Sequence, residues 1–418
     1  MVGGIRAVER CDALGHAPYS DMAGGLHRGY LTPAYAASQQ SVASWMAEAG
    51  MTVRIDVAGN LVGRYEGTAS GPALIIGSHL DSVRDAGRYD GPLGIMLGIE
   101  CVAALHAAGR RPSFPIEVYA FGDEEGSRFP LAMLASRAVA GTLGDIAHEP
   151  VDAQGVSFFQ ALRDYGARAG VPVAASFGEY AAARHEGAFA YFEAHIEQGP
   201  ALETAGLPVG NVTAIAAQKR YAIQLTGRAG HAGTTAMGLR RDALAAAAEM
   251  MLATEALALS AGGEHVATVG TIAAAPGAAN VIPGVVRFTL DVRAATDAGC
   301  AGLAAALLDR FDAIAAQRGI KLAADLLHEL PASPSDPALM DLLDQAIGAE
   351  GVPIRRLMSG AGHDAMILSA LCPTAMLFIR CADGISHNPA ERVAVSDVEV
   401  AARVMLRFIE NLEGLRNA

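Results

Sequence analysis

The sequence lacks the features that mark several classes of protein. Its 418 residues include only five cysteines, an odd number with no shared spacing. A disulfide framework is therefore not expected, and a reducing compartment fits better. The chain also lacks a lysine/arginine cluster, and its formal net charge is −13, which argues against nucleic-acid binding. The cysteines are Cys11, Cys101, Cys300, Cys372 and Cys381.

Long apolar runs are missing as well. The longest, residues 93–108, contains Glu100 and His106 and is too short to span a bilayer, so a buried helix is expected there. Residues 1–11 carry charged side chains and no apolar core, which is not the pattern of a signal peptide. We therefore expect a cytoplasmic protein that does not engage a membrane.

What the sequence does contain is typical of a soluble enzyme. Hydrophobic residues make up 52% and charged residues 18%, so disorder is not expected. A chain of 418 residues is too long for one compact core, and two domains are the default expectation.

The first part of the chain, to about Asn211, alternates apolar strand-like runs with helical runs rich in alanine and leucine. This alternation predicts an α/β domain with a doubly wound sheet. One expected strand, residues 73–77, ends just before His79, and another, residues 115–121, ends just before Glu124 and Glu125. Open α/β sheets carry their chemistry at the carboxyl ends of strands, so both segments are candidates for a site.

The pattern changes after Gly210. Strands are expected at residues 213–227, 266–272 and 285–293, and helices at 239–261 and 300–319. This order predicts a small α+β sandwich inserted into the larger domain. We therefore expect a discontinuous catalytic domain of residues 1–211 and 329–418, and an inserted domain of residues 212–328. The first inserted helix is expected to cover the insert's own sheet with an apolar face of Leu244, Ala247, Met251, Leu252 and Leu257. A second apolar side, or an exposed edge strand of the sandwich, would suit a dimer contact.

Five short segments offer histidine or carboxylate side chains beside glycine. His79 alone would be an ordinary core or surface histidine, but Asp81 stands where it can hold the imidazole from behind, as metal-bound histidines require. Asp90, before Gly91 and Pro92, could be a simple turn or capping residue. The same loop also suits a carboxylate that bridges two metals.

The adjacent pair Glu124 and Glu125 is more informative. Neighbouring side chains cannot bind one metal from the same direction, so one glutamate would bind a metal and the other would act as a general base. Like charges in a shielded pocket should raise the pKa of the base toward the working pH. The alternative, a solvated acidic turn, fits poorly at the end of an apolar strand.

Counting ligands gives two sites that share Asp90. His79 and His195 complete one site with Asp90, and Glu125 and His387 complete the other. Each metal would keep open positions for water and substrate, as catalytic sites do. The nitrogen and oxygen ligands without thiolate suit two divalent ions, Zn²⁺ or Mn²⁺.

Over nearly its whole length the chain resembles the M20-type dinuclear metallohydrolases, and among them the hydantoinase/carbamoylase amidases. In the related peptidases a carboxylate usually takes the place of His195, so this histidine indicates the amidase branch. The segments that carry the resemblance are residues 77–83, 90–94, 124–129, 195–200, 230–235, 280–284, 360–365 and 386–389.

The resemblance implies a lid domain that also mediates homodimerisation, and it implies roles for individual residues. Glu124 would be the base, Asp81 would support His79, and His231 would polarise the carbonyl or stabilise the oxyanion. Some lid residues would reach the active site from the partner subunit. The lid residues Arg220, Asn280 and Arg293 would bind substrate. Gln198 and His363 are further candidate substrate-binding residues of the pocket.

The expected reaction is hydrolysis of a carbamoyl C–N bond in a ureido acid, releasing ammonia and carbon dioxide. Arg293 offers a planar fork for the substrate carboxylate, and Asn280 adds an amide donor. Allantoate is the leading candidate, because Arg220 stands in a Gln-x-Arg-Tyr segment typical of allantoate-type members. N-carbamoyl-L-amino acids and 3-ureidopropionate follow. Remoter alternatives are an aminoacylase or dipeptidase, disfavoured by His195, and a metal-binding protein without catalysis, disfavoured by Glu124.

Overall fold

The computed structural model describes residues 3–144 and 146–417. It divides into two compact units. The first comprises residues 1–212, 335–357 and 363–418, and the second comprises residues 213–334 and 358–362. The second unit extends past the expected boundary at residue 328, because strand β12 continues to Leu330 and a short strand, β13, follows it.

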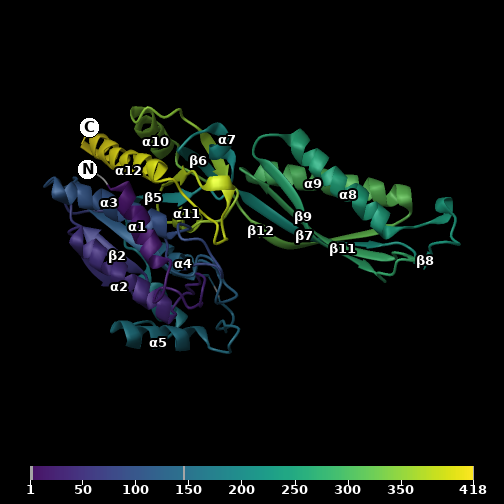
Figure 1. Cartoon of the computed structure of the whole chain (residues 1–418), viewed down its shortest axis with the longest axis horizontal. Coiled ribbons are helices and arrows are strands. Elements are labelled where there is room, and N and C mark those ends of the chain that lie inside the picture. Colours follow the sequence, from purple (N-terminus) through teal and green to yellow (C-terminus); the bar gives the residue numbers. More distant parts are fainter. Residues whose placement is uncertain (1–2, 145, 418) are drawn as a thin grey trace. The chain divides into compact units, whose positions relative to one another are not determined.

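The first unit is built on a mixed sheet in the order β1-β2-β4-β3-β5-β15-β6, of which Figure 1 labels β2, β5 and β6. Strands β4, β3, β5 and β15 run parallel to one another, whereas the pairs β1–β2, β2–β4 and β15–β6 are antiparallel. Every residue of β3 and β4 is buried, as parallel strands covered on both faces should be. The strands are β1 (Thr52–Ile55), β2 (Leu61–Tyr65), β3 (Ala73–His79), β4 (Ile116–Phe121), β5 (Ala188–Ile196), β6 (Val209–Ile215), β14 (Arg356–Ser359) and β15 (Thr374–Ile379).

Helices cover both faces of this sheet. Helix α3 packs on β3, β4 and β5, and it also contacts α1 and α12. Helices α4 and α11 contact each other, and α11 contacts β3, β5 and β15. The expected α/β fold class is confirmed. The helices are α1 (Gly4–Leu14), α2 (Pro33–Glu48), α3 (Pro92–Ala107), α4 (Leu134–Ala140), α5 (Phe158–Ala169), α6 (Phe177–Tyr180), α7 (Ala201–Ala205), α10 (Pro337–Ala349), α11 (Asp364–Leu368) and α12 (Val395–Asn417).

Helix α3 matters most for the position of the site. Pro92 occupies its first turn, where the missing N–H costs no hydrogen bond. A Cβ at Gly94 would lie 2.1 Å from the carbonyl oxygen of Ala194, so only glycine lets α3 approach β5 this closely. The approach brings Asp90, which stands two residues before the helix, next to the end of β5.

The second unit contains a four-stranded antiparallel sheet in the order β12-β7-β11-β9. Helices α8 and α9 contact each other and this sheet, and Phe288 packs against Phe311 in the core between them. The elements are β7 (Ala217–Thr226), β8 (Gly230–His231), α8 (Ala243–Ala261), β9 (His265–Ala275), β10 (Val281–Ile282), β11 (Val285–Ala294), α9 (Asp297–Arg318), β12 (Lys321–Leu330) and β13 (Ser333–Pro334).

Two details of this unit differ from the sequence-based expectations. Strand β12 was not expected, because as an edge strand it is exposed along most of its length and shows no clear alternation. Of the expected apolar face of α8, Ala247 is buried in the core of this unit and Leu257 packs against that core, whereas Leu244 and Leu252 are exposed. The helix also buries Ala246 and Met250. An alanine-rich helix can pack closely through its small residues and leave its leucines outside.

Helix α8 has the length and hydropathy of a membrane-spanning helix, but core helices of soluble proteins pass the same test.

Candidate metal centre

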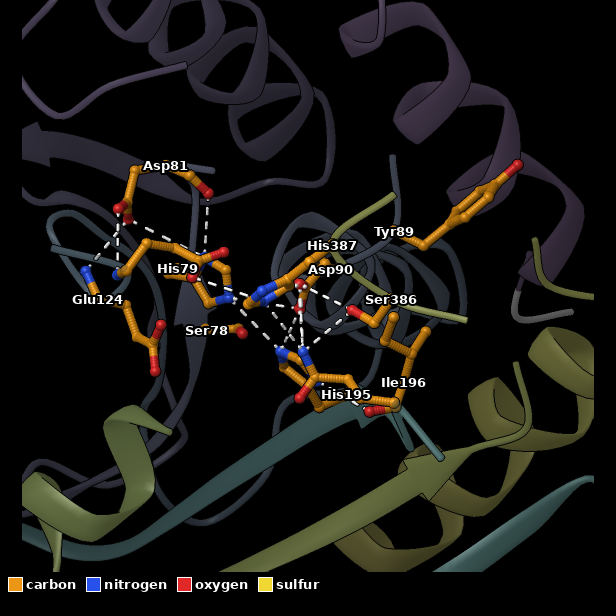
Figure 2. Close-up of polar contacts among 12 residues, drawn as sticks. Ser78, His79, Asp81, Tyr89, Asp90, Glu124, His195, Ile196, Ser386 and His387 are labelled. Carbon is orange, nitrogen blue, oxygen red and sulfur yellow. Dashed lines mark hydrogen bonds and ion pairs between the residues drawn. The ribbon is translucent and has the colours of Figure 1, made fainter. Parts of the chain in front are cut away.

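The five predicted ligands come together at the carboxyl ends of the central strands of the first unit, and Figure 2 labels His79, Asp90, His195 and His387 among them. His79 ends β3 and His195 is the penultimate residue of β5. Asp90 precedes α3, Glu125 follows β4, and His387 lies in the loop beyond β15. Loops at this edge of an open sheet meet in one place, although the residues are far apart in the sequence.

Asp90 is the centre of the cluster. One of its oxygens, Oδ1, lies 3.1 Å from Nε2 of His195 and 3.8 Å from Nε2 of His79. The other, Oδ2, lies 3.1 Å from Nε2 of His387, and that nitrogen is 3.6 Å from Oε2 of Glu125. The carboxylate thus faces one pair of side chains with each oxygen, as a bridging ligand would.

The orientation of the histidines suits metal binding. Nδ1 of His79 lies 3.0 Å from the backbone carbonyl of Asp81, and Nδ1 of His195 lies 2.9 Å from that of Ile196. A proton on each Nδ1 would be donated to the carbonyl, leaving the Nε2 lone pair directed at the cluster. Oε1 of Glu125 is buried without a hydrogen-bond partner. These donors fit two divalent cations.

Asp81 plays a different part from the one expected. Its carboxylate lies 3.9 Å from His79, and the backbone carbonyl supports the ring instead. The two carboxylate oxygens accept hydrogen bonds of 3.3 Å from the backbone N–H groups of Glu124 and Glu125. Asp81 therefore orients the histidine through its backbone and the glutamate pair through its side chain.

Burial sets the ionisation of the carboxylates. Burial and the neighbouring carboxylates raise the pKa of Glu124 well above its ordinary value. Burial raises the pKa of Glu125 to about 7, despite the opposing effect of His79. Burial also opposes the charged form of Asp90, but hydrogen bonds to the three histidines hold its pKa well below the ordinary range. The raised pKa of Glu124 is the property that a general base needs near neutral pH.

Gln198 and His363, the predicted pocket residues of this unit, both border the cluster. Nε2 of Gln198 lies 3.2 Å from each oxygen of Asp90 and 3.1 Å from Oγ of Ser386. The buried ring of His363 meets that of His195 edge-on, with centroids 4.4 Å apart. Their contact with substrate remains a prediction.

The other predicted substrate residues lie in the second unit and form two groups. His231 pairs with Val281 between the short strands β8 and β10, and the carbonyl of Asn280 accepts a hydrogen bond from Ala232. Arg220 on β7 and Arg293 on β11 lie together on the four-stranded sheet. Their approach to the metal centre also remains a prediction.

Asp291 is a residue of this region that sequence reasoning missed. Its carboxylate accepts hydrogen bonds from Arg220 at 2.9 and 3.0 Å and from Arg293 at 2.8 Å, and it also binds Gln218. Arg293 further donates to the carbonyl of Gly360. Asp291 stands two residues before Arg293 on one strand and so shares its face, a spacing that could have revealed it.

A cleft of about 500 Å³ lies elsewhere in the first unit, where the segments preceding β3 and β5 meet. At its base Glu117 accepts hydrogen bonds from Arg64 at 2.7 Å and His185 at 3.1 Å. These contacts outweigh burial and lower the pKa of Glu117 to about 2. The carboxylate of Glu117 is thus paired with Arg64 and His185 within the protein. The candidate catalytic residues lie at the metal centre rather than in this cleft.

Comparison with known proteins agrees with this geometry. Residues 75–411 match the model of peptidase family M20/M25/M40. The chain belongs to this family. As a member it is a metallohydrolase that cleaves amide C–N bonds, and the resemblance noted from the sequence is confirmed.

Individual relatives cover almost the entire chain. An N-carbamoyl-L-amino acid amidohydrolase of Geobacillus stearothermophilus is 40% identical, over 99% of this chain and 99% of the relative. Allantoate deiminase 2 of Glycine max is 38% identical, over 97% of this chain and 89% of the relative.

Solved structures agree with these relatives. A hydantoinase/carbamoylase family amidase from Burkholderia multivorans superposes with a TM-score of 0.89 at 36% identity, over 98% of this chain and 97% of that structure. A dinuclear metal-binding M20 peptidase of Bacillus subtilis, 15% identical over 98% of both chains with a TM-score of 0.58, shares the fold.

The contacts of Asp81 generate a prediction. Asp81→Asn should leave both cations bound but lower kcat by about 10- to 100-fold, the usual effect of losing a residue that orients ligands. An asparagine can accept one backbone N–H, but its NH₂ group would face the other. Metal content by atomic emission and initial rates check this. Asp85→Asn, at an exposed neighbouring position, is the matched control, and an unchanged kcat in Asp81→Asn would contradict the assignment.

Proposed function

We propose that this protein is a dinuclear metal-dependent amidohydrolase that removes the carbamoyl group from a ureido acid. The observation that carries the proposal is the pairing of His195 with His79 on one oxygen of Asp90. A histidine at this position is typical of the amidase branch. The full-length similarity to a carbamoyl-amino acid amidohydrolase and an allantoate deiminase supports it.

The metal centre would supply the nucleophile. His79 and His195 would hold one cation, Glu125 and His387 the other, and Asp90 both. Two bound Zn²⁺ or Mn²⁺ ions would lower the pKa of water from ~15.7 toward ~7 and polarise the ureido carbonyl.

Glu124 would move the proton. Its buried carboxylate, with a raised pKa, accepts the proton of the attacking water and delivers it to the leaving nitrogen. The water oxygen bonds to the ureido carbon and the C–N bond breaks, which yields the amine and carbamic acid. Carbamic acid then decomposes to ammonia and carbon dioxide. His231, if it reaches the site, would donate to the developing oxyanion.

The two arginines of the second unit would bind the substrate carboxylate. Arg220 and Arg293 share the carboxylate of Asp291, so one positive charge of the pair remains uncompensated. That charge suits one carboxylate of the substrate. Asn280 would add an amide donor.

Allantoate is the proposed substrate, because Arg220 stands in a Gln-x-Arg-Tyr segment typical of allantoate-type members. N-carbamoyl-L-amino acids form the second candidate class, favoured by the 40% identity to an enzyme named for that activity. The third candidate is 3-ureidopropionate.

Ammonia release distinguishes these candidates. The purified protein with added Mn²⁺ or Zn²⁺ should release ammonia from allantoate faster than from N-carbamoyl-L-amino acids or 3-ureidopropionate. Glu124→Gln should keep both cations but lower kcat by at least ~10²-fold, because it cannot accept the proton. No ammonia from any ureido acid would overturn the proposed function, and turnover by Glu124→Gln would overturn the base assignment alone.

Arg293→Ala should raise KM for the ureido acid by about 10- to 100-fold with a smaller effect on kcat, because it removes a charge-assisted carboxylate contact. Arg287→Ala provides the control, since Arg287 lies on the same strand and binds Gln224 instead. Steady-state kinetics on both variants give the comparison. Equal KM values in the two variants would refute the carboxylate clamp.

We also propose that the protein forms a homodimer through the second unit. Leu244, Leu252 and Leu259 of α8 are 38%, 68% and 74% exposed, and their spacing places them on one side of the helix. An exposed apolar stripe of this kind suits a protein partner.

Sedimentation of the full chain should show a dimer, and Leu252→Asp combined with Leu259→Asp should give a monomer. Ile354→Asp, at an exposed position in the first unit, should leave the dimer intact. A monomeric native chain would refute the proposal.

A further inference from the structure

Glu391 lies outside the predicted ligand set but is only 4% exposed. Its Oε1 accepts hydrogen bonds from two successive backbone N–H groups, those of Tyr89 at 2.9 Å and Asp90 at 3.2 Å. A carboxylate oxygen that accepts two backbone N–H groups fixes the peptide units that carry them. The backbone beneath Asp90 is therefore held by a residue about 300 positions later in the chain.

The other oxygen of Glu391 reaches the loop that carries His387. Oγ of Ser386 lies 3.3 Å from Oε2 of Glu391 and 3.1 Å from Oδ2 of Asp90, and Figure 2 shows Ser386 beside Asp90 and His387. The adjacent His387 places Nε2 3.1 Å from the same oxygen of Asp90. One side chain thus connects the two segments that meet at Oδ2 of Asp90.

The chain leaves room for this carboxylate. A Cβ added at Gly87 would lie 2.2 Å from the carboxyl carbon of Glu391 and 2.4 Å from its Cβ. The backbone of Gly87 does not adopt a positive φ, so an alanine would meet no backbone strain there. Space for Glu391 is the reason for glycine at this position.

We propose that Glu391 is a positioning residue. It holds Asp90 and His387 at the separation required by the cation that His387 and Glu125 would bind together with Asp90. It acts as a hydrogen-bond acceptor, through two backbone N–H groups on one side and Ser386 on the other. This inference rests on the proposed function, because it takes Asp90 and His387 to be metal ligands. Residues in such supporting positions typically change metal affinity by about 10- to 100-fold.

The test is metal binding by the full chain rather than turnover. Native protein is stripped of metal with a chelator and titrated calorimetrically with Mn²⁺ alone and with Zn²⁺ alone. We expect two sites in the native chain. In Glu391→Ala, affinity should fall about 10- to 100-fold at one site and stay within about twofold at the other.

Two further variants distinguish hydrogen-bond acceptance by Glu391 from the effect of its charge and from a general loss of protein stability. Glu391→Gln should retain most of the affinity, because its amide oxygen can accept the same two N–H groups. Gly87→Ala should reproduce the defect of Glu391→Ala, because it displaces the carboxylate without removing it. Gly348→Ala, where an added Cβ meets no atom within 4 Å, and Asp397→Asn, a buried carboxylate paired with Arg380, should both bind like the native chain.

The possible outcomes distinguish a failure of the positioning role of Glu391 from a failure of the proposed metal centre. Two sites of native affinity in Glu391→Ala and Gly87→Ala would overturn the positioning role and leave the metal centre intact. A defect in Glu391→Gln as large as in Glu391→Ala would overturn hydrogen-bond acceptance as its basis. Fewer than two cations in the native chain would overturn both the metal centre and this inference. If Glu391→Ala does not fold, as judged by circular dichroism, the metal affinities of Glu391→Gln and Gly87→Ala test the positioning role instead.

Discussion

The buried carboxylate of Asp90 is the constraint on which the rest of the site depends. A buried carboxylate without compensation would be protonated or expelled toward water. Here it faces Nε2 atoms of three histidines, two of them at 3.1 Å. Glu124 and Glu125 add two more carboxylates that burial drives toward the neutral form. An arrangement with this many buried acids and so few cationic side chains is stable when divalent cations balance it.

Close backbone packing at glycines makes this arrangement possible, in addition to the polar contacts of Asp90 with Gln198 and Ser386. Gly91 has a φ of +82°, and a Cβ there would lie 2.5 Å from atoms of His79. Gly94 allows α3 to meet the backbone of β5, and Gly87 leaves space for Glu391. The short loop between β3 and α3 can therefore bring Asp90 under two histidines from different strands. A larger side chain at any of these three glycine positions would displace the carboxylate of Asp90, although it would replace none of the predicted ligands.

Sequence reasoning predicted five ligand side chains that the structure brings together, because most of them lie at the end of a recognisable strand or before a glycine-rich turn. The sequence could not predict which atoms of a residue make the supporting contacts. Asp81 is the example: its backbone carbonyl contacts His79, while its carboxylate accepts hydrogen bonds from the backbone N–H groups of Glu124 and Glu125. That division depends on local backbone direction. Glu391 escaped notice because its partners lie about 300 residues away. The exposed edge strand β12 escaped because hydrophobic alternation appears only where a strand buries one face.

Under the proposed function, hydrolysis and substrate choice make opposite electrostatic demands, and the residues proposed for each lie in separate units. The first unit concentrates buried carboxylates, which would repel an anionic substrate unless cations are present. The second unit carries Arg220 and Arg293 on one exposed sheet face, where Asp291 neutralises one of the two charges and holds both guanidinium groups. A single remaining positive charge favours a substrate with one carboxylate over a neutral one, without collecting every anion in solution. Because this group shares no residue with the metal cluster, the proposed function implies that substitutions there would change which ureido acid is accepted while the cleavage chemistry stays the same.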